Sequence, residues 1–115
     1  MLNNKERDAA LALQEAFEKK FAKDIVVLEL GSVSPIADYF VIATGGSTPQ
    51  FAALTQTAEE VLESFDIKLG HTEGLQAGKW VLLDFGVIIV HLFDKESRDY
   101  YNLERIWGDA RIVKA

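Results

Sequence analysis

The sequence of 115 residues has no cysteine, only two prolines and no long hydrophobic run. Without thiols the chain cannot form disulfides or thiolate metal sites, and it cannot use a cysteine nucleophile. The longest apolar stretch, Val87 to Phe93, is interrupted by His91 and is much too short to span a membrane. Residues 1–8 contain acidic side chains and no apolar signal core, so we expect no targeting peptide and a cytoplasmic location.

Positive charge is also scarce, because 12 Lys and Arg residues face 18 Asp and Glu residues, giving a net charge of −6 and a pI of about 4.8. An acidic surface repels phosphate backbones, so we expect no direct nucleic-acid specificity. The charge suits a basic protein partner, although mild acidity also serves solubility. With 49% hydrophobic residues the chain can build a core, and its length predicts one domain over residues 1–115.

The first half predicts helices and strands in alternation. Apolar residues at helical spacing predict a helix over residues 4–22, with a face of Ala9, Leu13, Ala16, Phe17 and Phe21. Residues 25–30 and 39–44 predict strands, and the second lacks alternation, which is typical of a central strand covered on both faces. Ser47 with Gln50 three residues later predicts a capping box. The amphipathic helix that follows has an apolar face from Phe51 to Phe65.

The second half predicts a hairpin and a last helix. Residues 67–71 can form a short strand, followed by a polar loop over 72–78. Residues 79–85 and 87–93 flank Gly86 and predict an antiparallel pair. Asp94 predicts the N-cap of a helix that runs to about Trp107, and residues 111–115 are either extended or loose. The order predicts one α/β domain with a mixed sheet of about five strands, flanked by helices.

Three hairpin residues invite a functional interpretation. Asp84 and His91 are the ionisable groups of an otherwise apolar hairpin, and a buried charge costs several kcal/mol, by order of magnitude, unless it is paired. The plain alternatives are a satisfied core histidine and a carboxylate that caps the hairpin turn. Trp80, which follows Lys79 at the start of the 79–85 strand, is either a core residue or an exposed anchor for a partner, since Trp is enriched in binding hot spots.

The last helix is rich in aromatic and charged residues. Tyr100, Leu103 and Trp107 share one face at helical spacing, which predicts that they belong to the core. Tyr101 and Glu104 lie on an adjacent flank, where they can be exposed. Mixtures of Tyr, Trp and Arg are typical of interface centres, and they are also ordinary in helices that cover sheets.

A catalytic site is not predicted. The pair at residues 31–32 and the acid Asp38 resemble nucleotidyltransferases, but that two-metal chemistry needs a second carboxylate where this chain has Phe40. The turn at residues 44–47 resembles a phosphate-cradling loop without the P-loop or Rossmann pattern, so we interpret it as a strand turning into a capped helix. His71 and His91 form no metal-ligand motif. We therefore expect no metal and no cofactor.

Several segments, taken together and in order, resemble the ribosomal silencing factor (Iojap-related) family. The resemblance runs in register from about Asp24 to Trp107. The matching segments are residues 37–45 with Ser47 and Gln50, residues 73–74, residues 80–86, residues 90–91, and Arg98 with residues 101–107. Each segment alone is weak evidence for the family, and the resemblance rests on the order and the separations of the segments.

The resemblance implies a binding function without catalysis. Members of this family bind the large ribosomal subunit at its basic ribosomal protein fourteen, block the small subunit sterically and repress translation when nutrients are limiting. Organelle relatives act in assembly of the large subunit, so an assembly factor that uses the same surface is one alternative. A residual nucleotide-binding enzyme is another, since the family fold is nucleotidyltransferase-like without the catalytic carboxylates. A free strand edge or aromatic patch would also allow a homodimer.

The resemblance also implies the partner-binding residues. Trp80 matches the family tryptophan of the partner-binding surface. The other matching motif positions are Glu73, Asp84, His91, Arg98, Tyr101 and Glu104. One position departs from the family pattern, because Val87 stands where an acidic residue usually follows the turn glycine.

Overall fold

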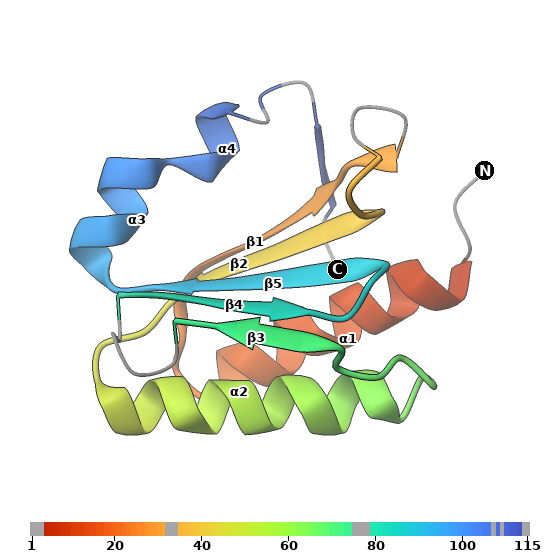
Figure 1. The fold of residues 1–115 in the computed structure, drawn as a ribbon, viewed down its shortest axis with the longest axis horizontal. Coiled ribbons are helices and arrows are strands. Elements are labelled where there is room, and N and C mark those ends of the chain that lie inside the picture. The colour runs from red at the N-terminus through yellow and green to blue at the C-terminus, as the bar shows by residue number, and fades with distance from the viewer. Residues whose placement is uncertain (1–3, 32–34, 75–78, 107, 109, 114–115) are drawn as a thin grey trace.

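The computed structural model describes residues 4–31, 35–74, 79–106, 108 and 110–113, and it has a central sheet with helices on both faces (Figure 1). In chain order the elements are α1 (Asn4–Lys19), β1 (Lys23–Glu29), β2 (Tyr39–Thr44), α2 (Thr48–Glu63), β3 (His71–Glu73), β4 (Trp80–Asp84), β5 (Ile88–Phe93), α3 (Lys95–Tyr101), α4 (Leu103–Ile106) and β6 (Arg111–Val113). The predicted α/β class is confirmed.

The sheet has six strands in the order β3-β4-β5-β2-β1-β6, one more than the five expected. β2 and β5 pair in parallel and the other neighbours pair antiparallel, so the sheet is mixed, as predicted. The added strand is β6, which pairs with β1 at the sheet edge. The short strand expected over residues 67–71 instead lies at His71–Glu73, so it overlaps that range only at His71 and continues into the segment predicted to be a polar loop. β2 and β5 are buried along their whole length, as the absence of alternation in residues 39–44 predicts.

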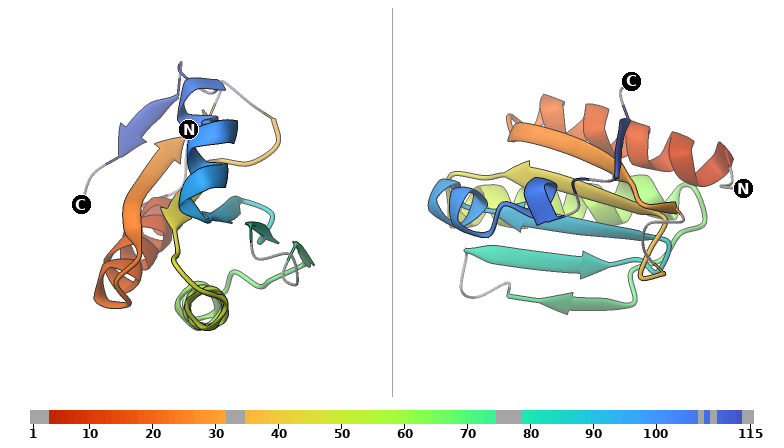
Figure 2. Two further views of the ribbon diagram at one scale, coloured as in Figure 1. Left: turned by 90° about the vertical axis from the view of Figure 1, so that its left-hand side faces the viewer. Right: turned by 90° about the horizontal axis from the view of Figure 1, so that it is seen from above.

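One face of the sheet is covered by α1 and α2, which lie side by side (Figures 1 and 2). These helices and the strands enclose the larger core cluster, to which β4 contributes Val81 and Leu83. The opposite face carries a second cluster that includes Phe40 and Leu103. α3 and α4 lie on this face, where Tyr101 at the end of α3 packs on Trp80 at the start of β4 (Figures 1 and 2). No described helix covers β3 there.

The first helix ends at Lys19, three residues earlier than predicted. The Ala22 amide donates to the Phe17 carbonyl and the Phe21 amide to the Glu18 carbonyl, which is the Schellman pattern of helix termination. Phe21 takes the left-handed conformation of that motif, with φ of 65°, and its side chain is 83% exposed. The prediction that Phe21 extends the buried face is wrong, because the chain has already left the helix there.

The start of α2 matches its sequence signal with one difference. The Ser47 hydroxyl accepts a hydrogen bond from the Gln50 amide at 3.2 Å, so Ser47 is the predicted N-cap. The Gln50 side chain reaches back to the Gly46 amide, one residue before the position of a capping box. Phe51, Leu54 and other residues of the predicted apolar face are buried.

The last helix is broken rather than continuous. Asp94 caps α3 by accepting from the Ser97 amide at 2.8 Å, as predicted, but Asn102 adopts φ of 45° and separates α3 from α4. The break changes the helical phase, because residues on either side of Asn102 no longer share one helix. Tyr100 is therefore 81% exposed instead of belonging to the core, while Leu103 is buried. Trp107 lies outside the described residues.

Candidate functional site

Trp80 lies at the centre of an aromatic cluster on the face that carries α3 and α4. It begins β4 and pairs across the sheet with Phe93 of β5, whose ring centroid is 5.0 Å from that of Trp80. Tyr101, at the end of α3, places its ring 4.6 Å from Trp80 and is 42% exposed. Trp80 itself is half-buried. The ring centroids of Phe93 and Tyr101 are themselves only 6.1 Å apart, so the three rings pack against one another and the indole keeps part of its surface accessible.

His91 lies beneath Trp80 and accepts a hydrogen bond from it. The indole Nε1–H of Trp80 donates to His91 Nδ1 at 3.1 Å, and the imidazole is only 4% exposed. Burial lowers the pKa of His91 from 6.5 to about 4, because charge is unfavourable away from water. His91 is therefore neutral near pH 7, and it is a partly satisfied core histidine rather than a surface group.

An acidic and apolar edge continues the cluster across β4 and β3. Glu73 pairs with Leu82, which pairs with His91, so all three side chains lie in one cross-strand row on the same face. Glu73 is exposed, Leu82 is half-buried, and both line a depression of about 210 Å³ together with Trp80 and Gly74. We call Trp80, Leu82, Tyr101 and Glu73 the docking surface.

Gly74 fits closely beside Trp80. Its φ is 81°, and a Cβ added there would lie 2.0 Å from the Trp80 carbonyl oxygen. Two independent features thus require glycine at position 74, namely the left-handed backbone conformation and the close approach of β4. The segment that carries Glu73 can lie against Trp80 only because residue 74 has no side chain.

Asp84 has a turn-capping role in the hairpin. Its Oδ1 accepts a hydrogen bond from the Gly86 amide at 2.8 Å, and the side chain is half-buried. Asp84 pairs with His71 across the sheet, so it lies on the same face as the docking surface, toward the other end of β4. Val87 packs against the larger core cluster, on the opposite side from Trp80. An acid at position 87 would therefore not extend the docking surface directly.

Arg98 is inside the protein. Its side chain is buried, and Nη1 donates to Thr44 Oγ1 at 2.9 Å, which joins α3 to the end of β2. Arg98 therefore supports the docking surface from below rather than forming part of it. Glu104 lies in α4, and its side chain is outside the described part of the structure.

Two residues of this region were not predicted correctly from the sequence. Leu82 was not predicted to bind a partner, and Tyr100 was predicted to lie in the core. Strand alternation already puts Leu82 on the Trp80 face, so that signal was present in the sequence. Tyr100 contacts Tyr101 edge to face at 5.1 Å and extends the aromatic surface outward. No local sequence pattern predicts the exposure of Tyr100, because its position depends on the helix break at Asn102.

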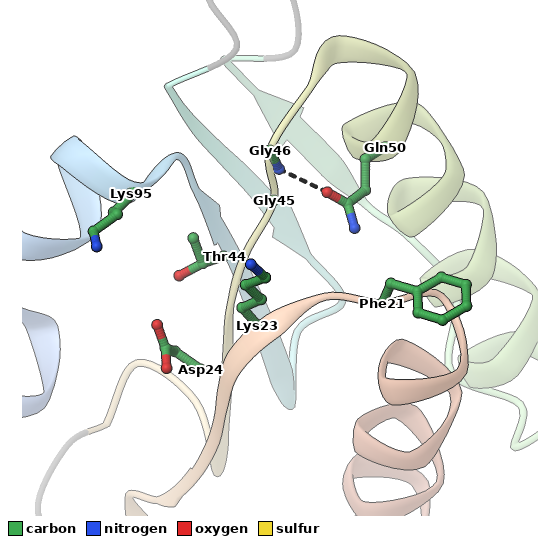
Figure 3. A pocket seen from close by; sticks show the side chains of 8 residues that line it. All are labelled: Phe21, Lys23, Asp24, Thr44, Gly45, Gly46, Gln50 and Lys95. Carbon is green, nitrogen blue, oxygen red and sulfur yellow. Dashed lines mark hydrogen bonds between the residues drawn. The ribbon is translucent and has the colours of Figure 1, made fainter.

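Residues 44–46 of the turn line a different pocket, of about 400 Å³, together with Gln50 (Figure 3). Lys23, Lys95 and Asp24 also line it. The Gly46 amide, which could bind a phosphate, already donates to Gln50 Oε1 at 2.6 Å (Figure 3), and the Gln50 amide donates to Ser47. These bonds favour the interpretation of the turn as a helix cap.

The nucleotidyltransferase resemblance leaves Asp38 without the second carboxylate that the two-metal pattern requires at position 40. Phe40, at the position of the missing second acid, is buried and lies edge to face against His91 at 4.5 Å. Asp38 instead forms a side-chain hydrogen bond with Glu6, which raises the pKa of Glu6. Among the described residues, no three His, Cys, Asp or Glu side chains are grouped so that they could hold a metal ion, and no helix is long and apolar enough to cross a bilayer.

Comparisons with known proteins agree on one family. The model of the family described as "Ribosomal silencing factor during starvation" matches residues 3–115. A ribosomal silencing factor of Bacillus subtilis is 40% identical over 98 residues, which cover 85% of this chain and 83% of that protein. A mouse protein named mitochondrial assembly of ribosomal large subunit protein 1 is 32% identical over 89 residues, 75% of this chain and 39% of its own length. A crystal structure of a Chromobacterium violaceum protein is similar with a TM-score of 0.81 and 31% identity, and covers 89% of this chain and 85% of that one.

Proposed function

Since the chain belongs to the ribosomal silencing factor family, we propose that it binds the large ribosomal subunit through the basic ribosomal protein fourteen and keeps the small subunit from joining. Repression of translation under nutrient limitation follows from that block. The observation that carries the proposal is the half-buried Trp80, which packs against Phe93 and Tyr101. The same residue lines the depression beside Glu73 and Leu82.

The docking surface has the composition of a protein interface. Trp80 and Tyr101 offer large rigid rings with polar edges, and Leu82 adds apolar area beside them. Glu73 is exposed at the margin, in a chain whose net charge is −6. An apolar centre with an acidic margin fits a basic partner, because the charges orient the encounter and the buried rings slow dissociation.

The mechanism is steric and requires no reaction. Bound at the joining face of the large subunit, a protein whose principal extents are 37 × 30 × 25 Å occupies space that the small subunit needs. The buried Phe40 at the position of the second carboxylate supports a binding role rather than nucleotidyl transfer.

Sedimentation of mixed ribosomal subunits in sucrose gradients tests the proposal. Saturating protein is expected to reduce the joined-ribosome peak, and Trp80→Ala is expected to weaken binding to purified large subunits by about 2 kcal/mol or more, the hot-spot scale. Phe21→Ala is the matched control, because Phe21 is an exposed aromatic residue outside the docking surface. An unchanged joined peak at saturating wild-type protein would contradict the proposal.

Assembly of the large subunit is the second candidate, favoured by the name of the mouse relative. It uses the same partner and surface, so binding measurements cannot separate it from silencing. A deletion strain separates the two. Accumulation of large-subunit precursors during growth would favour assembly, whereas normal precursors with faulty repression during starvation would favour silencing.

A further inference from the structure

The hydrogen bond between Trp80 and His91 has a fixed direction. An indole N–H can only donate, so His91 Nδ1 must be the acceptor. The neutral imidazole consequently carries its proton on Nε2. The two residues lie on neighbouring strands, since Trp80 pairs with Phe93 and His91 pairs with Leu82. The bond therefore runs diagonally across the β4–β5 pair.

The imidazole is itself held firmly. Phe40 lies edge to face against it at 4.5 Å, and Phe93 lies nearly parallel to it at 6.2 Å with an interplanar angle of 9°. Its Nε2 is buried without a hydrogen-bond partner in the described part of the chain. A buried imidazole in this state is less favourable than an apolar ring of similar size, so core packing alone does not account for a histidine here.

We propose that His91 is a positioning residue, which holds the Trp80 indole in the orientation that docks on the partner. The inference rests on the proposed function and deepens it, because it assigns the buried histidine a role in the same surface. Without the Nδ1 acceptor, the half-buried indole N–H must turn toward water to find a partner. The ring then leaves its place against Phe93 and Tyr101 and has to be ordered again on binding, which weakens affinity.

Three variants test this role on purified large subunits. His91→Phe keeps an aromatic ring but removes the acceptor, and it is expected to weaken binding about tenfold. His91→Gln can still accept from the indole and is expected to stay within about threefold of wild type. Trp80→Phe removes the donor, so adding His91→Phe to it is expected to cause no further loss, as a double-mutant cycle requires for residues that act through one contact.

A second readout follows the indole itself. The indole N–H resonance of Trp80 in a proton–nitrogen correlation NMR spectrum is identified by its absence from the spectrum of Trp80→Phe. Hydrogen exchange of this indole is expected to be slow in wild type and in His91→Gln, and much faster in His91→Phe. A role for His91 in core packing alone would change the melting temperature without this difference between the two variants.

The outcomes separate this inference from the proposed function. Failure of wild-type protein to bind large subunits overturns the proposed function, and the positioning role with it, before any variant is made. Normal wild-type binding together with undiminished binding by His91→Phe overturns only the positioning role. The positioning role is also overturned if His91→Phe weakens binding equally in the wild-type protein and in the Trp80→Phe variant. His91 would then act independently of the indole.

Discussion

Arg98 and Thr44 are 54 residues apart in the sequence and meet inside the protein, where Arg98 Nη1 donates to Thr44 Oγ1 at 2.9 Å. The bond ties α3 to the end of β2. Because α3 ends in Tyr101, this buried contact also fixes one wall of the docking surface.

Thr44→Val is expected to destabilise the protein by about 1–3 kcal/mol, because it leaves a buried guanidinium without one of its acceptors. Urea unfolding measures the change. Thr72→Val, a half-buried β3 position of the same chemistry, is the control and should change stability by less than about 0.5 kcal/mol. Equal effects of the two substitutions would argue against a structural role for the Arg98–Thr44 bond.

His91 predicts a fall in stability at mildly acidic pH. Its pKa is about 4 in the folded protein and 6.5 without the fold, so the unfolded chain binds more protons as pH drops below 6.5. Unfolding is then favoured, and this group should remove about 2 kcal/mol of stability between pH 7 and pH 5. Denaturant melts of wild type and His91→Phe across that range measure it. The variant should show a shallower dependence, and identical slopes would show that His91 is not the titrating group.

Two glycines with similar backbone angles should respond differently to alanine. Gly74 and Gly86 have φ of 81° and 82°, but a Cβ meets the Trp80 carbonyl at Gly74 and nothing within 4 Å at Gly86. Gly86→Ala is expected to cost about 1–2 kcal/mol from the left-handed conformation alone. Gly74→Ala should cost more and should also weaken binding to large subunits, because β4 must shift at Trp80. Thermal melts and the sedimentation assay compare the two, and equal losses would refute the close approach.

Tyr101→Ala is expected to weaken binding to the large subunit by about 1–2 kcal/mol while leaving the fold intact, since Tyr101 is 42% exposed and packs on Trp80 at 4.6 Å. Titration of large subunits with labelled protein measures the loss. Phe21→Ala serves again as the control for losing an exposed ring. Wild-type affinity in Tyr101→Ala would remove this residue from the docking surface.

Glu73→Gln is expected to slow association with the basic partner several-fold and to reduce its salt dependence, with little change in dissociation. Stopped-flow or surface-based kinetics at two salt concentrations measure both rates. Glu59→Gln makes the same charge change at an exposed position of α2, on the opposite side of the sheet, and should leave both rates unchanged. If the two variants slowed association equally, the effect would belong to net charge rather than to the docking surface.

The sequence by itself determined the features that depend on near neighbours. Ser47 and Asp94 cap their helices as predicted, because a capping bond joins residues three apart. Gly86 turns the hairpin, and strand alternation places Trp80 with Leu82 on one face of β4 and His91 with Phe93 on one face of β5. The interpretation of Asp84 as the cap of that hairpin turn is also confirmed.

Only the tertiary structure decided what meets across the fold. The break at Asn102 sends Leu103 into the core and leaves Tyr100 outside, and helical spacing alone could not reveal it. Whether Trp80 is core or anchor depends on where α3 ends, because Tyr101 packs on one part of the indole while Trp80 also lines the depression beside β3. Such long-range contacts are fixed by the packing of the whole chain, whereas caps and turns are fixed by a few adjacent residues.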